Sequence, residues 1–138
     1  MRVFVDTNVL LDVLAERKPH YDASAAVWLL AESGRLDAAV AAVSFTNCWY
    51  LVRRFGGAAA AGKAIRLLRD VFRPVDFTAQ VLNQAIDARF DDFEDAVQYH
   101  SAVQARAKCL LTRNVDHFPR TPIPVLSPAE FLAANSFR

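Results

Sequence analysis

Short apolar runs alternate with longer segments of helical periodicity along the whole chain, and this alternation limits the possible folds more than any other feature. Strands separated by helices form parallel pairs through right-handed crossovers, and helices then cover both faces of the sheet. We therefore expect an α/β fold, a three-layer α/β/α sandwich around a mostly parallel sheet of about five strands. The expected strands are residues 2–5, 38–43, 72–75, 109–112 and 124–126.

Helical periodicity and end signals predict seven helices between and after these strands. Gly34 ends the second helix, and Gly56 with Gly57 divides two helices in the middle of the chain. The last helix opens with a capping box, in which Ser127 precedes Glu130 by three positions. The expected helices are residues 8–15, 22–33, 46–55, 58–70, 78–89, 92–107 and the segment that begins at Pro128.

The size and composition favour a single compact domain over residues 1–138. The chain is 54% apolar, enough for one core, and its net charge of +1 indicates no general attraction to nucleic acid. Its two cysteines lie in apolar stretches, which predicts buried thiols in a reducing compartment. The sequence has no apparent signal peptide, and its longest apolar stretch is too short to span a bilayer. These features predict a cytoplasmic protein without a membrane partner.

Several acidic and amide side chains are expected at one edge of the sheet. Asp6 ends the first strand, Asn114 and Asp116 follow the fourth, and the carboxyl ends of parallel strands share an edge. The helix that begins at Asp92 runs antiparallel to the fourth strand, and at ~1.5 Å per residue its start returns to that edge. Asp92 and Asp95, three residues apart, then point the same way.

Such a gathering of like charges requires compensation. Two carboxylates ~4 Å apart repel by roughly 4 kcal/mol at an effective dielectric of 20, so they share a proton or bind a cation. Oxygen ligands without a Cys or His cluster favour Mg²⁺ or Mn²⁺ over zinc. Because such an ion keeps open positions for water and phosphate oxygens, the pattern points to phosphodiester chemistry.

Four segments together resemble the PIN domain family. They are residues 6–12 (DTNVLLD), 92–96 (DFEDA), 112–118 (TRNVDHF) and the closing residues 123–132 (IPVLSPAEFL). They occur in the order and spacing typical of that family and extend over essentially the whole chain. The resemblance implies a Mg²⁺- or Mn²⁺-dependent endoribonuclease of the VapC toxin type, with RNA as substrate, an antitoxin protein as partner and a homodimeric assembly.

The resemblance also implies roles for individual residues. The expected catalytic residues are Asp6, Asp95 and Asp116. The expected metal ligands are these three together with Asn114 and Asp92. The expected supporting residues are Thr7, Asn8, Asn47 and Thr112. The metal would act as a Lewis acid and activate the attacking water, with a carboxylate as proton acceptor.

The chain departs from the family pattern at three positions. Asn47, Asn114 and His117 stand where the family usually carries acids, and Asp116 is displaced by one residue. Because an amide ligates without a charge, we expect weaker metal binding and one ion rather than two. The alternative is an inactive PIN scaffold that binds RNA or a protein. A phosphatase with Asp6 as nucleophile is disfavoured, because Asn8 occupies the place of a second Asp and no lysine is near the late acids.

Structural roles compete with these functional ones. Residues 6–8 could simply cap the first helix, and Asp92 and Glu94 could cap or charge a helix N-terminus. Asp12 is expected on a solvated helix face, with a role beside the site as the alternative, and His117 is expected to be a surface or packing residue.

Basic side chains cluster in the middle of the chain, against a single Asp70. The alternatives are a solvated helix face and a track for the phosphate backbone of RNA. The candidate RNA-binding residues are Arg53, Arg54, Lys63, Arg66, Arg69 and, after the fourth strand, Arg113.

Overall fold

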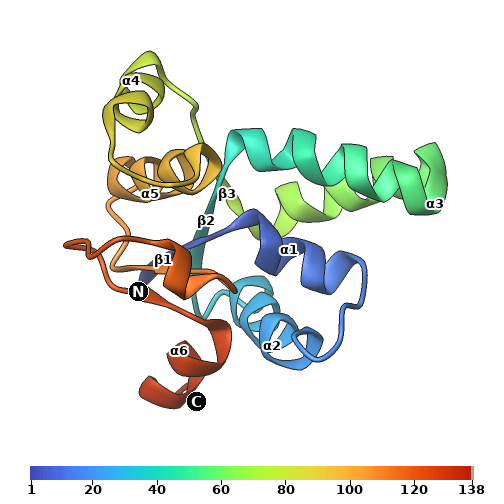
Figure 1. The fold of residues 1–138 in the computed structure, drawn as a ribbon. Coiled ribbons are helices and arrows are strands. Elements are labelled where there is room, and N and C mark those ends of the chain that lie inside the picture. Colours follow the sequence, from blue (N-terminus) through green and yellow to red (C-terminus); the bar gives the residue numbers. More distant parts are fainter. Residues whose placement is uncertain (138) are drawn as a thin grey trace.

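The computed structural model describes residues 1–137 and has the predicted fold class, a five-stranded sheet between layers of helices (Figure 1). Every strand pair is parallel, and the strand order is β3-β2-β1-β4-β5. The strands are β1 (Arg2–Val5), β2 (Asp37–Ala41), β3 (Arg73–Val75), β4 (Cys109–Leu111) and β5 (Val125–Leu126). The helices are α1 (Thr7–Leu14), α2 (Tyr21–Glu32), α3 (Ala42–Val71), α4 (Ala79–Asp87), α5 (Phe93–Gln104), α6 (Pro128–Ala134) and the 3₁₀ turn η1 (Val115–His117).

Two apolar clusters form the core, one on each face of the sheet. Successive side chains of a strand point to opposite faces, and β1 therefore contributes to both clusters. Val3 and Val5 pack with residues of α1, α2, α3 and α6, whereas Phe4 packs with Tyr99 and Ala102 of α5. Helix α4 lies against α5, outside this second layer (Figure 1). The central strands are thus held from both sides.

Helix α3 is longer than predicted and differs from the prediction in two ways. The strand expected over residues 38–43 ends at Ala41, so Ala42 and Val43 begin the helix. Since Phe4 pairs with Ala39, Ala41 already stands level with Asp6 at the edge of the sheet. The two helices expected here are arms of one hairpin that extends away from the sheet (Figure 1).

The reversal between the two arms of α3 depends on one glycine. Gly57 has a φ of 86° and a ψ of 175°, the only non-helical backbone within α3. A positive φ of this size is strained for residues with a side chain, which explains why glycine stands at the turn. The predicted division at Gly56 and Gly57 is therefore confirmed.

Capping side chains define the starts of three helices, which differ from the predicted starts by one residue at most. Thr78 accepts a hydrogen bond from the Val81 N–H at 3.1 Å, and Asp92 accepts one from the Asp95 N–H at 3.2 Å. The predicted capping box of Ser127 is confirmed. Helix α5 ends at Gln104, three residues before its predicted end, and Arg106 follows with a φ of 58°.

Both cysteines are free and buried, as predicted. Burial raises the pKa of the Cys48 thiol to about 12 and that of Cys109 to about 11. These thiols therefore serve as apolar packing groups at neutral pH. In residues 1–137, no helix combines the length and apolar content needed to cross a membrane.

Candidate active site

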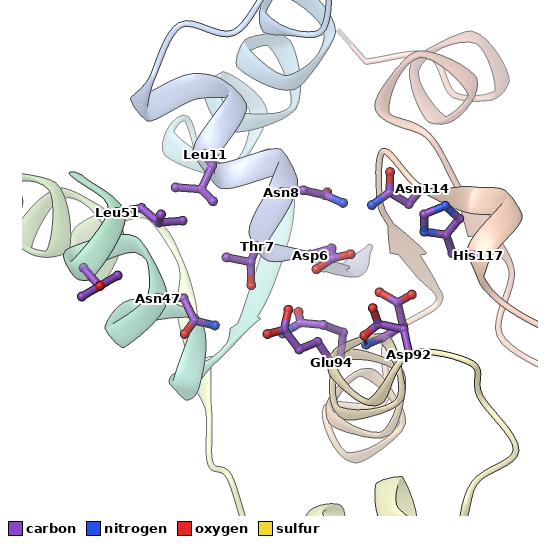
Figure 2. Close-up of a pocket in the computed structure, with 13 residues that line it drawn as sticks. Asp6, Thr7, Asn8, Leu11, Asn47, Leu51, Asp92, Glu94, Asn114 and His117 are labelled. Carbon is purple, nitrogen blue, oxygen red and sulfur yellow. Dashed lines mark hydrogen bonds between the residues drawn. The ribbon is translucent and has the colours of Figure 1, made fainter. Parts of the chain in front are cut away.

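An acidic cavity of about 430 Å³ opens at the carboxyl edge of the sheet, where β1 ends and α1, α3 and α5 begin (Figure 2). Four segments that are far apart in the sequence meet here. The residues that line the cavity are Asp6, Thr7, Asn8, Leu11, Asn47, Tyr50, Leu51, Asp92, Glu94, Asp95, Gln98, Asn114 and His117. This is the edge at which an open parallel sheet usually binds its ligands.

Asp6 lies at the centre of the cavity and is only 5% exposed. It ends β1, and its backbone N–H donates to the Leu111 carbonyl oxygen of β4 at 2.9 Å, which fixes its position. Burial raises the pKa of Asp6 to about 6, although the hydrogen bond from Thr112 opposes this shift. A carboxylate kept dry in this way binds a proton or a cation more readily than an exposed one.

Thr112 joins Asp6 to the segment that follows β4. Its fully buried hydroxyl donates to Oδ2 of Asp6 at 2.8 Å. The hydroxyl oxygen of Thr112 also accepts from Nδ2 of Asn8 at 3.2 Å and from the backbone N–H of Asn114 at 3.1 Å. The side-chain oxygen of Asn8 accepts from the N–H of Arg113 at 3.2 Å. Thr112 and Asn8 therefore hold the Asp6 side chain and the backbone at Asn114 in place.

The first turn of α5 supplies three acids to the cavity. Asp92 caps the helix and lines the cavity as well, so its structural and functional roles are compatible. Glu94 also lines the cavity. Asp95 is 8% exposed, and its buried Oδ2 has no hydrogen-bond partner within residues 1–137. The pKa of Asp95 is raised to about 6, chiefly by burial and next by the negative charges of Asp92 and Asp6. The charge of His117 opposes this shift.

A chain of polar side chains runs behind this acidic group. Thr7 and Ser44 share a hydrogen bond between their hydroxyl oxygens at 2.7 Å, and Nε2 of Gln98 donates to Ser44 at 3.3 Å. Gln98 is not among the residues predicted for the site. Its spacing could have indicated it, because a residue three positions after Asp95 lies on the same face of α5. Asn47 lines the cavity from α3, as Figure 2 shows.

The segment after β4 presents Asn114 and His117 to the cavity instead of Asp116. Residues three apart on a 3₁₀ turn face the same way, and η1 therefore aligns Asn114 with His117 (Figure 2). Asp116 is exposed and does not line the cavity, contrary to its expected place beside Asp6. His117, expected to be a surface or packing residue, is exposed and also lines the cavity.

Asp12 is not on a solvated helix face, so that prediction was wrong. Its carboxylate is fully buried in the core side of α1, where it accepts from the Ser24 hydroxyl at 3.3 Å. The guanidinium of Arg113 lies 3.3 Å from its other oxygen. Arg113, expected as a possible RNA-binding residue, is partly exposed and forms an ion pair with the buried Asp12 that links the end of β4 to α1.

The other basic candidates are exposed on the hairpin of α3. In the first arm, the guanidinium of Arg53 lies over the Trp49 ring at 5.2 Å, and that of Arg54 lies over the Tyr50 ring at 6.0 Å. Tyr50 lines the cavity, so Arg54 stands beside its rim. The exposed basic residues of the second arm are Lys63, Arg66 and Arg69. The last two border a separate depression next to Pro74.

The donor atoms of the cavity suit a hard cation such as Mg²⁺ or Mn²⁺. Carboxylate oxygens come from Asp6 and from the first turn of α5, and the buried Oδ2 of Asp95 has no other partner. Within residues 1–137, no three acidic, His or Cys side chains are arranged so that they could hold one ion. Amide oxygens and water would therefore complete the shell, as is usual for Mg²⁺.

The five parallel strands and the acidic cavity at their carboxyl edge define an α/β protein with a carboxylate-lined cleft. The sequence pattern of the PIN domain matches residues 2–116, and the chain belongs to this family. A curated relative, "Ribonuclease VapC1" from Aquifex aeolicus (strain VF5), is 26% identical over 135 residues, which cover 94% of this chain and 92% of the relative.

Solved structures from toxin–antitoxin systems share the fold. VapBC2 from Rickettsia felis, bound to a DNA fragment from its promoter, matches with a TM-score of 0.69 and 18% identity, over 92% of this chain and 98% of that one. VapC20 from Mycobacterium tuberculosis, described as a sarcin-ricin loop cleaving toxin, matches with a TM-score of 0.62 and 20% identity, over 78% and 86%. The predicted family and fold are thereby confirmed.

Proposed function

We propose that this chain is a Mg²⁺- or Mn²⁺-dependent endoribonuclease and the toxin of a toxin–antitoxin pair. The observation that carries the proposal is the pair of buried carboxylates, Asp6 and Asp95, which line one cavity and have raised pKa values. Membership of the PIN domain family and the ribonuclease activity in the name of the relative from Aquifex aeolicus support it.

In this proposal the ion is held by Asp6 and Asp95, with Asp92 and Asn114 at the sides of the site. A bound ion of this kind polarises a phosphate oxygen and activates a water molecule. Thr112 holds Asp6 in place, and a carboxylate of α5 accepts the proton of the attacking water. Asp116 has no part in this arrangement because it does not line the cavity.

The test is cleavage of a mixed RNA pool by the native chain with Mn²⁺, with Mg²⁺ and with EDTA. We expect cleavage only when an ion is present, together with a rise in the melting temperature on addition of Mn²⁺. A folded protein that cleaves no RNA under any of these conditions, and whose melting temperature changes with neither ion, would indicate the inactive scaffold. His117 and Asn114, which replace acids in the cavity, are the observation that favours this alternative. A phosphorylated Asp6 would indicate a phosphatase.

We also propose that the exposed basic face of α3 binds the RNA backbone. Replacing Arg53 and Arg54 by Gln is expected to raise KM several-fold with little change in kcat, because these residues touch phosphates and not the reacting atoms. The slope of log affinity against log salt concentration should fall by ~0.7 for each lost contact with a single strand. Lys108→Gln, at the opposite edge of the sheet, is the matched control. An unchanged slope would exclude a backbone track on this face.

The proposed partners are an antitoxin protein and a second copy of the chain. The complexes described for Rickettsia felis and Klebsiella pneumoniae support an antitoxin. Light scattering of the purified chain tests the homodimer, and a monomer at micromolar concentration would contradict it.

A further inference from the structure

Gln98 is a buried amide whose carbonyl oxygen is unused. The side chain lies on α5, one turn after Asp95, and is 4% exposed. Its Nε2 donates to the Ser44 hydroxyl at 3.3 Å, but Oε1 has no hydrogen-bond partner within residues 1–137. Gln98 is one of the residues that line the acidic cavity, so its unused acceptor lies next to the site.

An unused acceptor at this depth is costly. Leaving a buried polar atom without a partner costs about 1–3 kcal/mol, so such atoms are usually satisfied by water or a ligand. The neighbouring Oδ2 of Asp95 is buried and without a partner as well. Oδ2 of Asp95 and Oε1 of Gln98 therefore lie on the same face of α5 without a donor within residues 1–137. A bound cation, or a water molecule that donates a hydrogen bond, would satisfy them.

The orientation of Gln98 is fixed from behind. Thr7, at the start of α1, and Ser44, near the start of α3, share a hydrogen bond of 2.7 Å, and Ser44 receives the amide of Gln98. Nε2 is therefore occupied by this chain of hydroxyls. The remaining polar atom of the amide is Oε1, which can only accept a hydrogen bond.

We infer that Gln98 is a positioning residue whose Oε1 accepts a hydrogen bond from a water molecule in the hydration shell of the ion. Asp95 holds the ion itself, and the amide one turn later orients the water beside it. This inference rests on the proposed metal-dependent function. Asn47 and Asn114 line the cavity without a charge. The inference gives the neutral Gln98 a role in orienting water at the ion, which further acids would otherwise have.

The test is Mn²⁺ binding without RNA, measured by calorimetry and by the water-proton relaxation that bound Mn²⁺ causes. Gln98→Met keeps the size of the side chain but removes the acceptor. We expect it to weaken Mn²⁺ binding about 10-fold or more, as is typical when a group that supports a metal site is lost. Its melting temperature in EDTA should stay close to that of the native chain. Gln84→Met, on exposed α4, is the matched control and should bind Mn²⁺ normally.

Gln98→Glu retains an acceptor oxygen at the same place and adds a negative charge. We expect this variant to bind Mn²⁺ at least as tightly as the native chain. If Gln98→Met does not fold, this variant decides alone, and weaker binding than native would overturn the inference. Equal Mn²⁺ affinity and relaxation in native and Gln98→Met protein would also overturn it, while leaving the proposed function intact. A native chain that binds no Mn²⁺ would overturn both.

Discussion

Asp6→Asn is expected to lower RNA cleavage in Mn²⁺ about 100-fold or more. Groups that merely support a metal site are each worth about 10–100-fold, and a direct ligand at the centre of the cavity should matter at least as much. Asparagine keeps the shape and can still accept from Thr112, so the loss would reflect the missing charge. Asp95→Asn should behave in the same way, because it removes the negative charge of a carboxylate whose buried Oδ2 has no hydrogen-bond partner within residues 1–137.

Asp6→Asn is also expected to make the ion-free protein more stable at pH 7.5. Burial raises the pKa of Asp6 from 3.8 to about 6, so the folded state binds this proton more tightly than the unfolded state. The resulting stability is fully present below pH 3.8 and is lost as the pH rises through about 6. Above that pH the ionised carboxylate costs the folded state on the order of 2–3 kcal/mol, and asparagine removes this cost.

Urea unfolding in EDTA measures this effect, at pH 7.5 and near pH 4. The gain in the free energy of unfolding should be present at the higher pH and nearly absent at the lower one. Asp76→Asn, an exposed carboxylate, makes the same change of charge away from the cavity and should have little effect on stability or cleavage. Full cleavage by both Asp6→Asn and Asp95→Asn would show that the reaction takes place elsewhere.

Arg113→Met is expected to destabilise the fold by about 3–5 kcal/mol, the usual cost of leaving a buried charge without its partner. The substitution leaves the fully buried carboxylate of Asp12 with only the Ser24 hydroxyl as partner. It also removes one of the contacts between the end of β4 and α1, while the hydrogen bonds of Asn8 to Thr112 and to the Arg113 backbone remain.

A double-mutant cycle in urea separates the pair from its surroundings. Arg113→Met combined with Asp12→Leu should be more stable than Arg113→Met alone, because no unpaired charge remains in the core. Arg120→Met, an exposed arginine on the same segment, is the control and should change the unfolding free energy by less than about 0.5 kcal/mol. Destabilisation by Arg113→Met no larger than that of this control would contradict the role of the pair.

The sequence was sufficient to predict the sheet and the edge at which the acids meet. Strands separated by helices permit few arrangements, and in a parallel sheet the residue after each strand lies at a known edge. The positions of Asp6 and Asp95 depend only on these rules. For this reason one could be placed after a strand and the other at the start of a helix, without knowledge of any side-chain contact.

The predictions that failed concerned side chains whose surroundings come from remote parts of the chain. Asp12 follows three apolar residues on α1, and its burial depends on Arg113, which arrives from β4. Periodicity within one helix does not contain that information. Asp116 was expected in the cavity because it follows the fourth strand, but the 3₁₀ turn carries His117 there instead.

The length of the helical hairpin of α3 is structurally independent of the geometry of the cavity. The chain leaves the sheet edge at Ala42, reverses at Gly57 and returns to the sheet at Arg73, so both ends of the excursion are anchored in neighbouring strands. Whole turns added to or removed from the two arms would move the tip without moving Asn47 or Asp6. The length of the hairpin can therefore vary while the sheet and the cavity residues at its base stay in place.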